Sequence, residues 1–276
     1  EKIAMVNGDI AESEEFLGAG WFGSWLVFGK TEKTKHFDEE KIKLHGDVEV
    51  VYGENVRSDS EGLHFRLAGR DFSAAMFGEH NVMNILATLA VGKKLGLNWP
   101  LLQNSVQAFT NAPGRNEFIH EADTYGFKVI VDYSFEPRAI AALYDVVRLL
   151  KPNRVIHVFG STGGGRDVER RFTVGEYVGK HADICIVTDE DPYDDDPQKI
   201  IDDVAGAVEK TGKQKNIDLF CILDRKSAIK KAIELAEAGD LVLVTGMGSE
   251  QAMCIADGKK IFWDDREIVR DALKSK

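Results

Sequence analysis

Short apolar runs alternate with helical patterns throughout the second half of this chain, and this alternation most constrains the fold. The runs cover residues 127–133, 154–159, 183–188, 219–223 and 241–245. Between them, apolar residues recur three and four positions apart, as at Ile140, Leu143, Tyr144 and Val147. Apolar strands that alternate with amphipathic helices are typical of a parallel sheet covered on both faces. We therefore predict an α/β fold with a doubly wound, mostly parallel sheet.

The chain has 276 residues, which is enough for about two domains. Its rhythm changes near Ala112-Pro113-Gly114, and we place the boundary there, between residues 1–112 and 113–276. The first part contains short strand-like runs and then two helical patterns. The strand-like runs cover residues 2–7, 25–29, 48–52 and 63–67, and the helical patterns cover 81–95 and a segment from Asn98 with Pro100 in its first turn.

Composition excludes several classes of function. Asp and Glu outnumber Lys and Arg by 46 to 35, giving a net charge of -11, so we expect no nucleic-acid partner. The apolar runs are far shorter than the roughly 20 residues that span a bilayer, so we expect no membrane span. Cys185, Cys221 and Cys254 lie far apart and are odd in number. They suit small buried residues in a reducing compartment, which predicts the cytoplasm.

Ligands of open α/β sheets bind outside the carboxyl ends of the strands, so the residues after each apolar run are candidate site residues. These are Asp132-Tyr133 and the segments 160–167, 188–193 and 246–250. They hold glycines, carboxylates and an arginine. Each segment alone also fits a tight turn or a solvated acidic loop. Their joint position at one edge of the sheet favours a ligand site.

Several familiar sites are absent from the sequence. Segment 160–166 is rich in glycine, but it has neither the Gly-Lys-Ser/Thr ending of a P-loop nor Gly-x-Gly-x-x-Gly spacing, and the chain has no complete P-loop. Segment 246–250 lacks the Gly-x-Ser-x-Gly spacing of a hydrolase nucleophile. Histidines do not pair at i, i+4, and no cysteine pair has zinc-ligand spacing, so we predict no dedicated metal ligands. Magnesium brought in with a nucleotide remains compatible with the sequence.

Six motifs in order resemble the Mur ligases, and most closely their UDP-N-acetylmuramoyl-tripeptide synthetase branch. They occupy residues 78–87, 113–117, 131–133, 163–167, 188–193 and 246–250. The resemblance runs from about Asn7 to the end of the chain. It implies that residues 1–112 are the later part of the central α/β ATP-binding domain, without its P-loop. It also implies that residues 113–276 are the C-terminal Rossmann-like domain, which binds the amino acid.

The resemblance implies ATP-dependent formation of an amide bond, in which an amino acid is added to UDP-N-acetylmuramoyl-dipeptide through an acyl phosphate. ATP and Mg²⁺ would be the cosubstrate and the cofactor. Asn81 and Asn84 would lie at the adenine end of the nucleotide, although Asn81 also fits a helix N-cap. Arg115, near the phosphates, and Asp132, which would accept from the ribose hydroxyls, are the catalytic candidates. Tyr133 would contribute to the same nucleotide site.

For the amino acid, the resemblance implies that Arg166 clamps the α-carboxylate and that Glu250 holds an amine beside Gly246. Asp191 and Tyr193 stand where the diaminopimelate-adding enzymes carry Asn and Arg. The missing arginine removes a partner for a second carboxylate, and the aspartates at 191 and 194–196 favour a cationic end. We therefore expect lysine, or another diamine, rather than diaminopimelate.

Departures from the family pattern limit the expected activity. Phe135 replaces a histidine, and Met247 and Ser249 replace a lysine and a histidine. The P-loop lysine and the magnesium-holding residues are also missing, so we expect the chain to be inert alone and to need the N-terminal and P-loop regions. Two alternatives stay open: a ligase like folylpolyglutamate or cyanophycin synthetase, and a ligase-derived module that binds without turnover.

Overall fold

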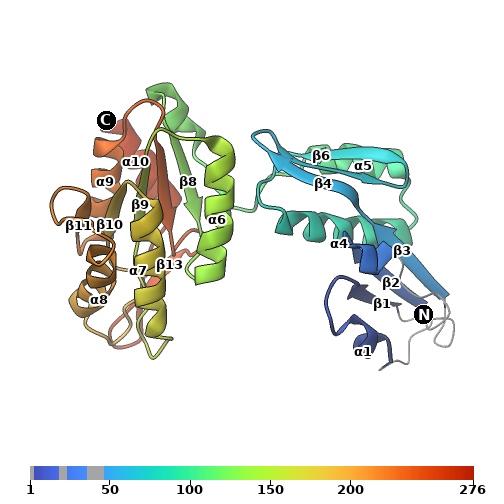
Figure 1. Cartoon of the computed structure of the whole chain (residues 1–276), viewed down its shortest axis with the longest axis horizontal. Coiled ribbons are helices and arrows are strands. Elements are labelled where there is room, and N and C mark those ends of the chain that lie inside the picture. The colour runs from blue at the N-terminus through green and yellow to red at the C-terminus, as the bar shows by residue number, and fades with distance from the viewer. Residues whose placement is uncertain (1–2, 19–23, 36–46) are drawn as a thin grey trace. The chain divides into compact units, whose positions relative to one another are not determined.

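In the computed structural model, the chain forms two compact units, residues 1–110 and 111–276. The structure describes residues 3–18, 24–35 and 47–276 (Figure 1). Unit 1 contains a parallel sheet in the order β1-β2-β3 and an antiparallel sheet in the order β4-β5-β6. Their bounds are β1 Ile3–Asn7, β2 Ser24–Gly29, β3 Asp47–Tyr52, β4 Glu54–Asp59, β5 Gly62–Leu67 and β6 Arg70–Ala74.

Unit 1 also has the helices α1 (Ser13–Gly18), α2 (Glu32–Lys35), α4 (His80–Lys94) and α5 (Trp99–Gln107). Helix α4 packs on β2 and β3, and α5 packs on β6. The predicted stripe of α4 is buried, with Ile85 and Leu86 almost inaccessible to solvent. As predicted, α5 starts after Asn98, whose side chain accepts from the Leu101 N–H at 2.9 Å and caps the helix.

Unit 2 contains a six-stranded sheet in the order β11-β10-β9-β12-β8-β7. Strands β8 to β12 pair in parallel, and β7 is antiparallel to β8, which confirms the predicted, mostly parallel sheet. The bounds are β7 Glu117–Phe118, β8 Lys128–Asp132, β9 Val155–Phe159, β10 Ile184–Val187, β11 Leu219–Cys221 and β12 Leu241–Thr245.

Helices cover both faces of this sheet (Figure 1). One apolar cluster joins α6 (Pro137–Leu150), α7 (Glu169–His181) and α8 (Pro197–Glu209) to one face. A second cluster joins α9 (Arg225–Leu235), α10 (Asp265–Lys274) and the 3₁₀ helix His120–Tyr125 to the other. Successive strand residues feed the two clusters in turn, because side chains alternate between the faces of a strand. The sheet is therefore doubly wound.

The connections define where this sheet can bind a ligand. After β9 the chain enters α7 on one face, whereas after β12 it reaches α10 on the opposite face. Strands β9 and β12 are neighbours, so their carboxyl ends lie at a topological switch point. Open α/β sheets bind ligands at this position.

Some features were not expected from the sequence. A hairpin of β13 (Ala252–Ile255) and β14 (Lys259–Phe262) follows β12. Cys185 is buried as predicted. Cys221 is exposed because it ends the edge strand β11, so the prediction that this cysteine is buried was wrong. Among the described residues, no helix is long and apolar enough to span a membrane. The cytoplasmic location stays a prediction.

Candidate functional site

Backbone segments meet closely at the carboxyl edge of the unit 2 sheet. A Cβ on Gly114 would lie 2.0 Å from the Gly248 carbonyl oxygen. A Cβ on Gly248 would lie 2.4 Å from the carbonyl carbon of Asp132. Only glycine allows this approach, so the segment before β7, the end of β8 and the loop after β12 form one tight junction.

Asp132 holds this junction together. Its carboxylate is buried, and Oδ2 accepts from the Asn116 N–H at 2.6 Å while Oδ1 accepts from the Ser134 N–H at 2.7 Å. Asn116 has a φ of 47°, so this bond fixes a left-handed turn. Each carboxylate oxygen can accept a further bond, so the ribose-binding role of Asp132 stays a prediction.

Arg115, Tyr133 and Glu250 are brought together from separate loops. The Arg115 guanidinium lies 4.4 Å from the centroid of the Tyr133 ring, within cation–π range. The Tyr133 hydroxyl donates to Glu250, and burial together with this carboxylate raises the pKa of Tyr133 to about 12. Tyr133 therefore keeps its proton at neutral pH.

The loop after β10 carries three consecutive carboxyl groups. Burial raises the pKa of Asp189 to about 6 and that of Glu190 to about 7, and it also raises the pKa of Asp191. Glu190 is only 2% exposed and accepts from the Thr162 hydroxyl at 3.1 Å. A Cβ on Gly246, which has a φ of 102°, would lie 2.0 Å from Glu190 Oε2. Glu190 belongs to the predicted candidate segment 188–193, but the sequence indicated a role only for its neighbour Asp191 and for Gly246.

The same loop is tied to the hairpin. Asp191 Oδ1 accepts from the Cys254 N–H at 2.6 Å, and the Tyr193 N–H donates to the Cys254 carbonyl at 3.1 Å. The Tyr193 side chain hydrogen-bonds with Arg166 and with Cys254. The negative charge of Glu250 contributes to the raised pKa of Asp191. All the substrate-binding candidates of unit 2 therefore lie in loops at one edge, with Arg166 exposed to solvent.

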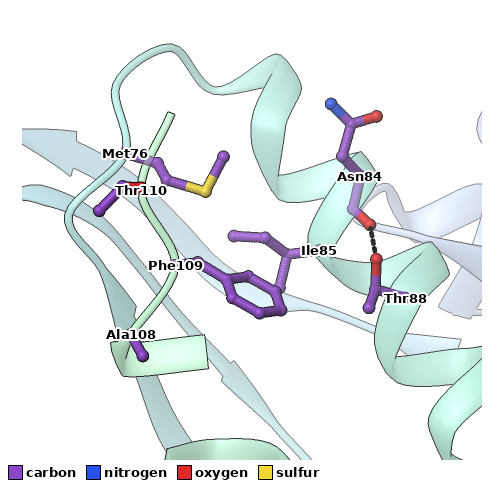
Figure 2. Close-up of a pocket in the computed structure, with 7 residues that line it drawn as sticks. All are labelled: Met76, Asn84, Ile85, Thr88, Ala108, Phe109 and Thr110. Atoms are coloured by element: carbon purple, nitrogen blue, oxygen red, sulfur yellow. Dashed lines mark hydrogen bonds between the residues drawn. The ribbon is translucent and has the colours of Figure 1, made fainter. Parts of the chain in front are cut away.

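Asn84 lines a pocket of about 390 Å³ in unit 1. The other lining residues are Met76, Ile85, Thr88, Ala108, Phe109 and Thr110. Figure 2 shows the Phe109 ring beside Ile85, with the Asn84 amide extending away from the ring at the pocket edge. The pocket thus offers an aromatic face and a polar rim.

Asn81 lies one turn before Asn84 and orients it. The Asn84 amide donates to Asn81 Oδ1 at 3.1 Å, and the Asn81 amide donates to the Phe77 carbonyl at 2.8 Å. Helix α4 starts at His80 after Glu79, so Asn81 belongs to its first turn and the alternative N-cap interpretation is wrong. Asn81 does not line the pocket.

Two substituted family positions are packed within unit 2. Phe135 meets Tyr133 edge-on with 5.1 Å between ring centroids, and the buried Arg170 lies 5.0 Å from the Phe135 ring. Met247 is 1% exposed. Within the described part of the chain, no group of three His, Cys, Asp or Glu side chains could hold a metal ion.

Sequence reasoning also missed Arg225. This residue is fully buried, and it pairs with Asp265 through Nε at 2.9 Å and Nη2 at 2.7 Å. Its importance depends on a partner 40 residues away, so no local motif marks it.

Comparison with known proteins places this geometry in context. Residues 114–248 match the family model "Mur ligase, glutamate ligase domain". The chain is 36% identical over 222 residues to a UDP-N-acetylmuramyl-tripeptide synthetase of Borreliella burgdorferi, covering 79% of this chain and 42% of that protein. It is 32% identical over 276 residues to the UDP-N-acetylmuramoyl-L-alanyl-D-glutamate--2,6-diaminopimelate ligase of Aquifex aeolicus, covering 99% of this chain and 51% of that protein. The chain thus spans about half the length of these relatives.

Solved structures share the fold. A UDP-N-acetylmuramoyl-L-alanyl-D-glutamate--2,6-diaminopimelate ligase has a TM-score of 0.61 at 24% identity, over 99% of this chain and 60% of that one. The folylpolyglutamate synthase of Thermotoga maritima also gives 0.61, at 15% identity and with the same coverage. At these identities the likeness concerns fold alone.

Proposed function

Because the chain belongs to the Mur ligase family, we propose that it provides the amino-acid-binding part, and a portion of the ATP-binding part, of an amino acid ligase. The proposed substrate is UDP-N-acetylmuramoyl-dipeptide. Its carboxylate takes the γ-phosphoryl group of ATP, releasing ADP and forming an acyl phosphate. The amine of the incoming amino acid then attacks the acyl carbon, and inorganic phosphate leaves as the amide forms.

The observation that carries this proposal is the cluster of carboxylates and a tyrosine at the switch point of unit 2. Glu250 accepts from the Tyr133 hydroxyl, and its charge raises the pKa of both Tyr133 and Asp191. An ammonium group placed there would relieve the repulsion between the two carboxylates. The exposed Arg166 guanidinium, bonded to Tyr193, would pair with the α-carboxylate of the same ligand.

Position 193 supports lysine over diaminopimelate. Diaminopimelate carries a second carboxylate at the far end of its side chain, which needs a cationic partner. Tyr193 supplies a hydroxyl instead, beside the Asp191 carboxylate. A side chain that ends in an ammonium group therefore suits this loop better.

The unit 1 pocket supports binding of the adenine base. Its volume of about 390 Å³ lies in the range of small-molecule sites. Phe109 and Ile85 offer apolar contact to a flat ring, and the Asn84 amide can both donate and accept at the edge. Arg115 and Asp132 remain our proposed contacts to the phosphates and the ribose.

We further propose that the chain needs the rest of the length that its relatives have. Phosphoryl transfer needs cations around the phosphates, and the chain has no complete P-loop. Magnesium would balance phosphate charge in the complete enzyme. The described residues do not form a metal-ligand cluster of three or more His, Cys, Asp or Glu side chains.

The test is a ligation assay with the complete product of the gene, UDP-N-acetylmuramoyl-dipeptide, ATP and Mg²⁺, with lysine or diaminopimelate. We expect phosphate release and a tripeptide product with lysine. Preference for diaminopimelate would contradict the specificity, and the absence of any ligated product would contradict the function. The 276-residue chain alone is the control, and it should give no product.

A matched variant tests position 193 separately. Tyr193→Arg should raise the use of diaminopimelate relative to lysine, because it restores a partner for the second carboxylate. Unchanged selectivity would exclude position 193 as a determinant. Amino acid binding without any ligation by the complete protein would instead favour the non-catalytic binding module.

A further inference from the structure

Arg225 contacts the backbone at the start of two loops that carry the candidate amino-acid site. It is the first residue of α9, after the capping residue Asp224, and its side chain is inaccessible to solvent. Besides the Asp265 carboxylate, its guanidinium donates to the Thr245 carbonyl at 2.7 Å and to the Asp189 carbonyl at 3.2 Å. One side chain therefore bonds the ends of two strands.

These two strand ends have no other direct connection through the sheet. Thr245 is the last residue of β12, and Asp189 follows the end of β10, but β9 lies between these strands. Pairing of both strands with β9 sets the spacing of the strands, but on β10 it ends at Val187 and does not extend to the loops that follow. Arg225 spans the end of β9 and supplies this link. The residues that follow the two bonded carbonyls include Gly246 and Asp191.

The end of β12 is also fixed from its other side. The buried His157 on β9 hydrogen-bonds through Nε2 with the Thr245 hydroxyl and through Nδ1 with the Tyr144 hydroxyl, each at 3.0 Å. Burial and the charge of Arg225 lower the pKa of His157 to about 3, so its ring is neutral. A connected polar chain thus runs from α6 through β9 and β12 to Arg225.

A buried ion pair is a costly way to stabilise a fold, since apolar residues of similar size often serve as well. The guanidinium does something that an apolar side chain cannot do, because it bonds two carbonyls and a carboxylate in fixed directions. We infer that Arg225 is a positioning residue, which holds the loops after β10 and β12 at the separation that amino acid binding requires. This inference rests on the proposed function.

The test compares Arg225→Lys with Arg154→Lys. Lysine keeps the positive charge but loses the planar fork. Arg154 also pairs with an aspartate through Nε and Nη2, at 3.2 and 2.6 Å from Asp240, but its side chain is partly exposed and lies at the opposite ends of β9 and β12, away from the proposed site. In the complete enzyme, Arg225→Lys should raise the KM for the amino acid at least about tenfold and leave the KM for ATP unchanged. Arg154→Lys should change neither.

Amide hydrogen exchange of the 276-residue chain gives a readout that does not need catalysis. In Arg225→Lys, two amides should exchange faster: that of Glu250, which donates to the Met247 carbonyl within the loop after β12, and that of Gly163, which donates to the Asp191 carbonyl in the loop after β10. The amide of Leu241, at the far end of β12, should not. Equal acceleration everywhere, or none, would overturn the inference, as would an unchanged KM. If the wild-type enzyme makes no product, the proposed function fails, and the exchange pattern still decides whether Arg225 ties the loops.

A second variant covers the case in which Arg225→Lys does not fold. Arg225→Met with Asp265→Leu removes both charges and replaces the pair with apolar side chains. It should unfold as a cooperative domain yet show the same faster exchange at Glu250 and Gly163. Wild-type exchange at both amides in this double variant would contradict the inference.

Discussion

The buried carboxyl group of Glu190 gives a pH dependence that can be worked out from the structure. Burial raises its pKa from the ordinary 4.5 to about 7, although Arg225, Thr162 and Arg170 oppose the rise, while Asp191 adds to it. The raised pKa means that the folded protein holds a proton that the unfolded chain has lost. The resulting stability is complete below pH 4.5 and is lost as the pH rises towards about 7.

At about 1.4 kcal/mol for each pH unit, this loss amounts to about 3 kcal/mol. Glu190→Gln keeps the size of the side chain and cannot ionise, so it lacks this slope. Relative to wild type, the variant should gain stability progressively between pH 4.5 and 7, by about 3 kcal/mol in all. Other titrating groups, such as Asp189 and His157, are present in both proteins, so their effects largely cancel in the difference.

The assay is urea unfolding of the two proteins at half-unit steps from pH 4 to 8, followed by far-ultraviolet circular dichroism. Glu234→Gln, at an exposed position of α9, is the matched control for the replacement of a carboxylate by an amide. A flat difference for Glu190→Gln would refute the reasoning. A difference that falls with pH would show that Glu190 is stabilised as the anion.

Three further predictions concern the same unit. Gly248→Ala should lower the free energy of unfolding by about 1–3 kcal/mol, because the added Cβ would overlap with neighbouring backbone atoms. Gly206→Ala, which has open space around it in α8, should raise the free energy of unfolding by up to about 1 kcal/mol. Thermal unfolding compares the two variants, and equal effects would contradict the tight junction. Tyr133→Phe should remove a phenolate transition near pH 12 from the ultraviolet titration, and loss of a transition near pH 10 instead would exclude the bond to Glu250. Asp265→Ala leaves the buried Arg225 charge unpaired and should cost about 3–5 kcal/mol in chemical unfolding; a cost below about 1 kcal/mol would show that water or another group compensates the charge.

The parallel sheet of unit 2 could be predicted because its strands are buried on both faces. Each is a short continuous apolar run, and this signal needs no knowledge of the strand's neighbours. Strand β14 gives no such signal, since all of its residues are exposed. Strand β7 has only two residues, and its pairing with β8 depends on tertiary structure.

The candidate site likewise has residues that the sequence could predict and residues whose roles depend on tertiary structure. Asp191, Gly246 and Glu250 lie in the short segments that follow apolar strands, so the sequence places them at the ligand-binding edge. The role of Asp132 in fixing the Asn116 turn could not be predicted, because it joins residues 16 positions apart through a turn with positive φ. Long-range partners of this kind are set by packing, and no local pattern encodes them.

The attachment of the hairpin limits how this protein can diverge. The loop after β10 holds the hairpin through the side chain of Asp191 and through both the backbone and the side chain of Tyr193, all bonded to Cys254. Residue 191 must therefore keep an oxygen acceptor, which both Asp and Asn supply, or the hairpin loses a support. The Tyr193 side chain adds a hydrogen bond to Cys254, but the bond from the backbone N–H of residue 193 does not depend on which side chain stands there. Selection can thus vary position 193 to suit a new amino acid at the loss of one side-chain bond, while the bonds from Asp191 and from the backbone of residue 193 still hold the hairpin.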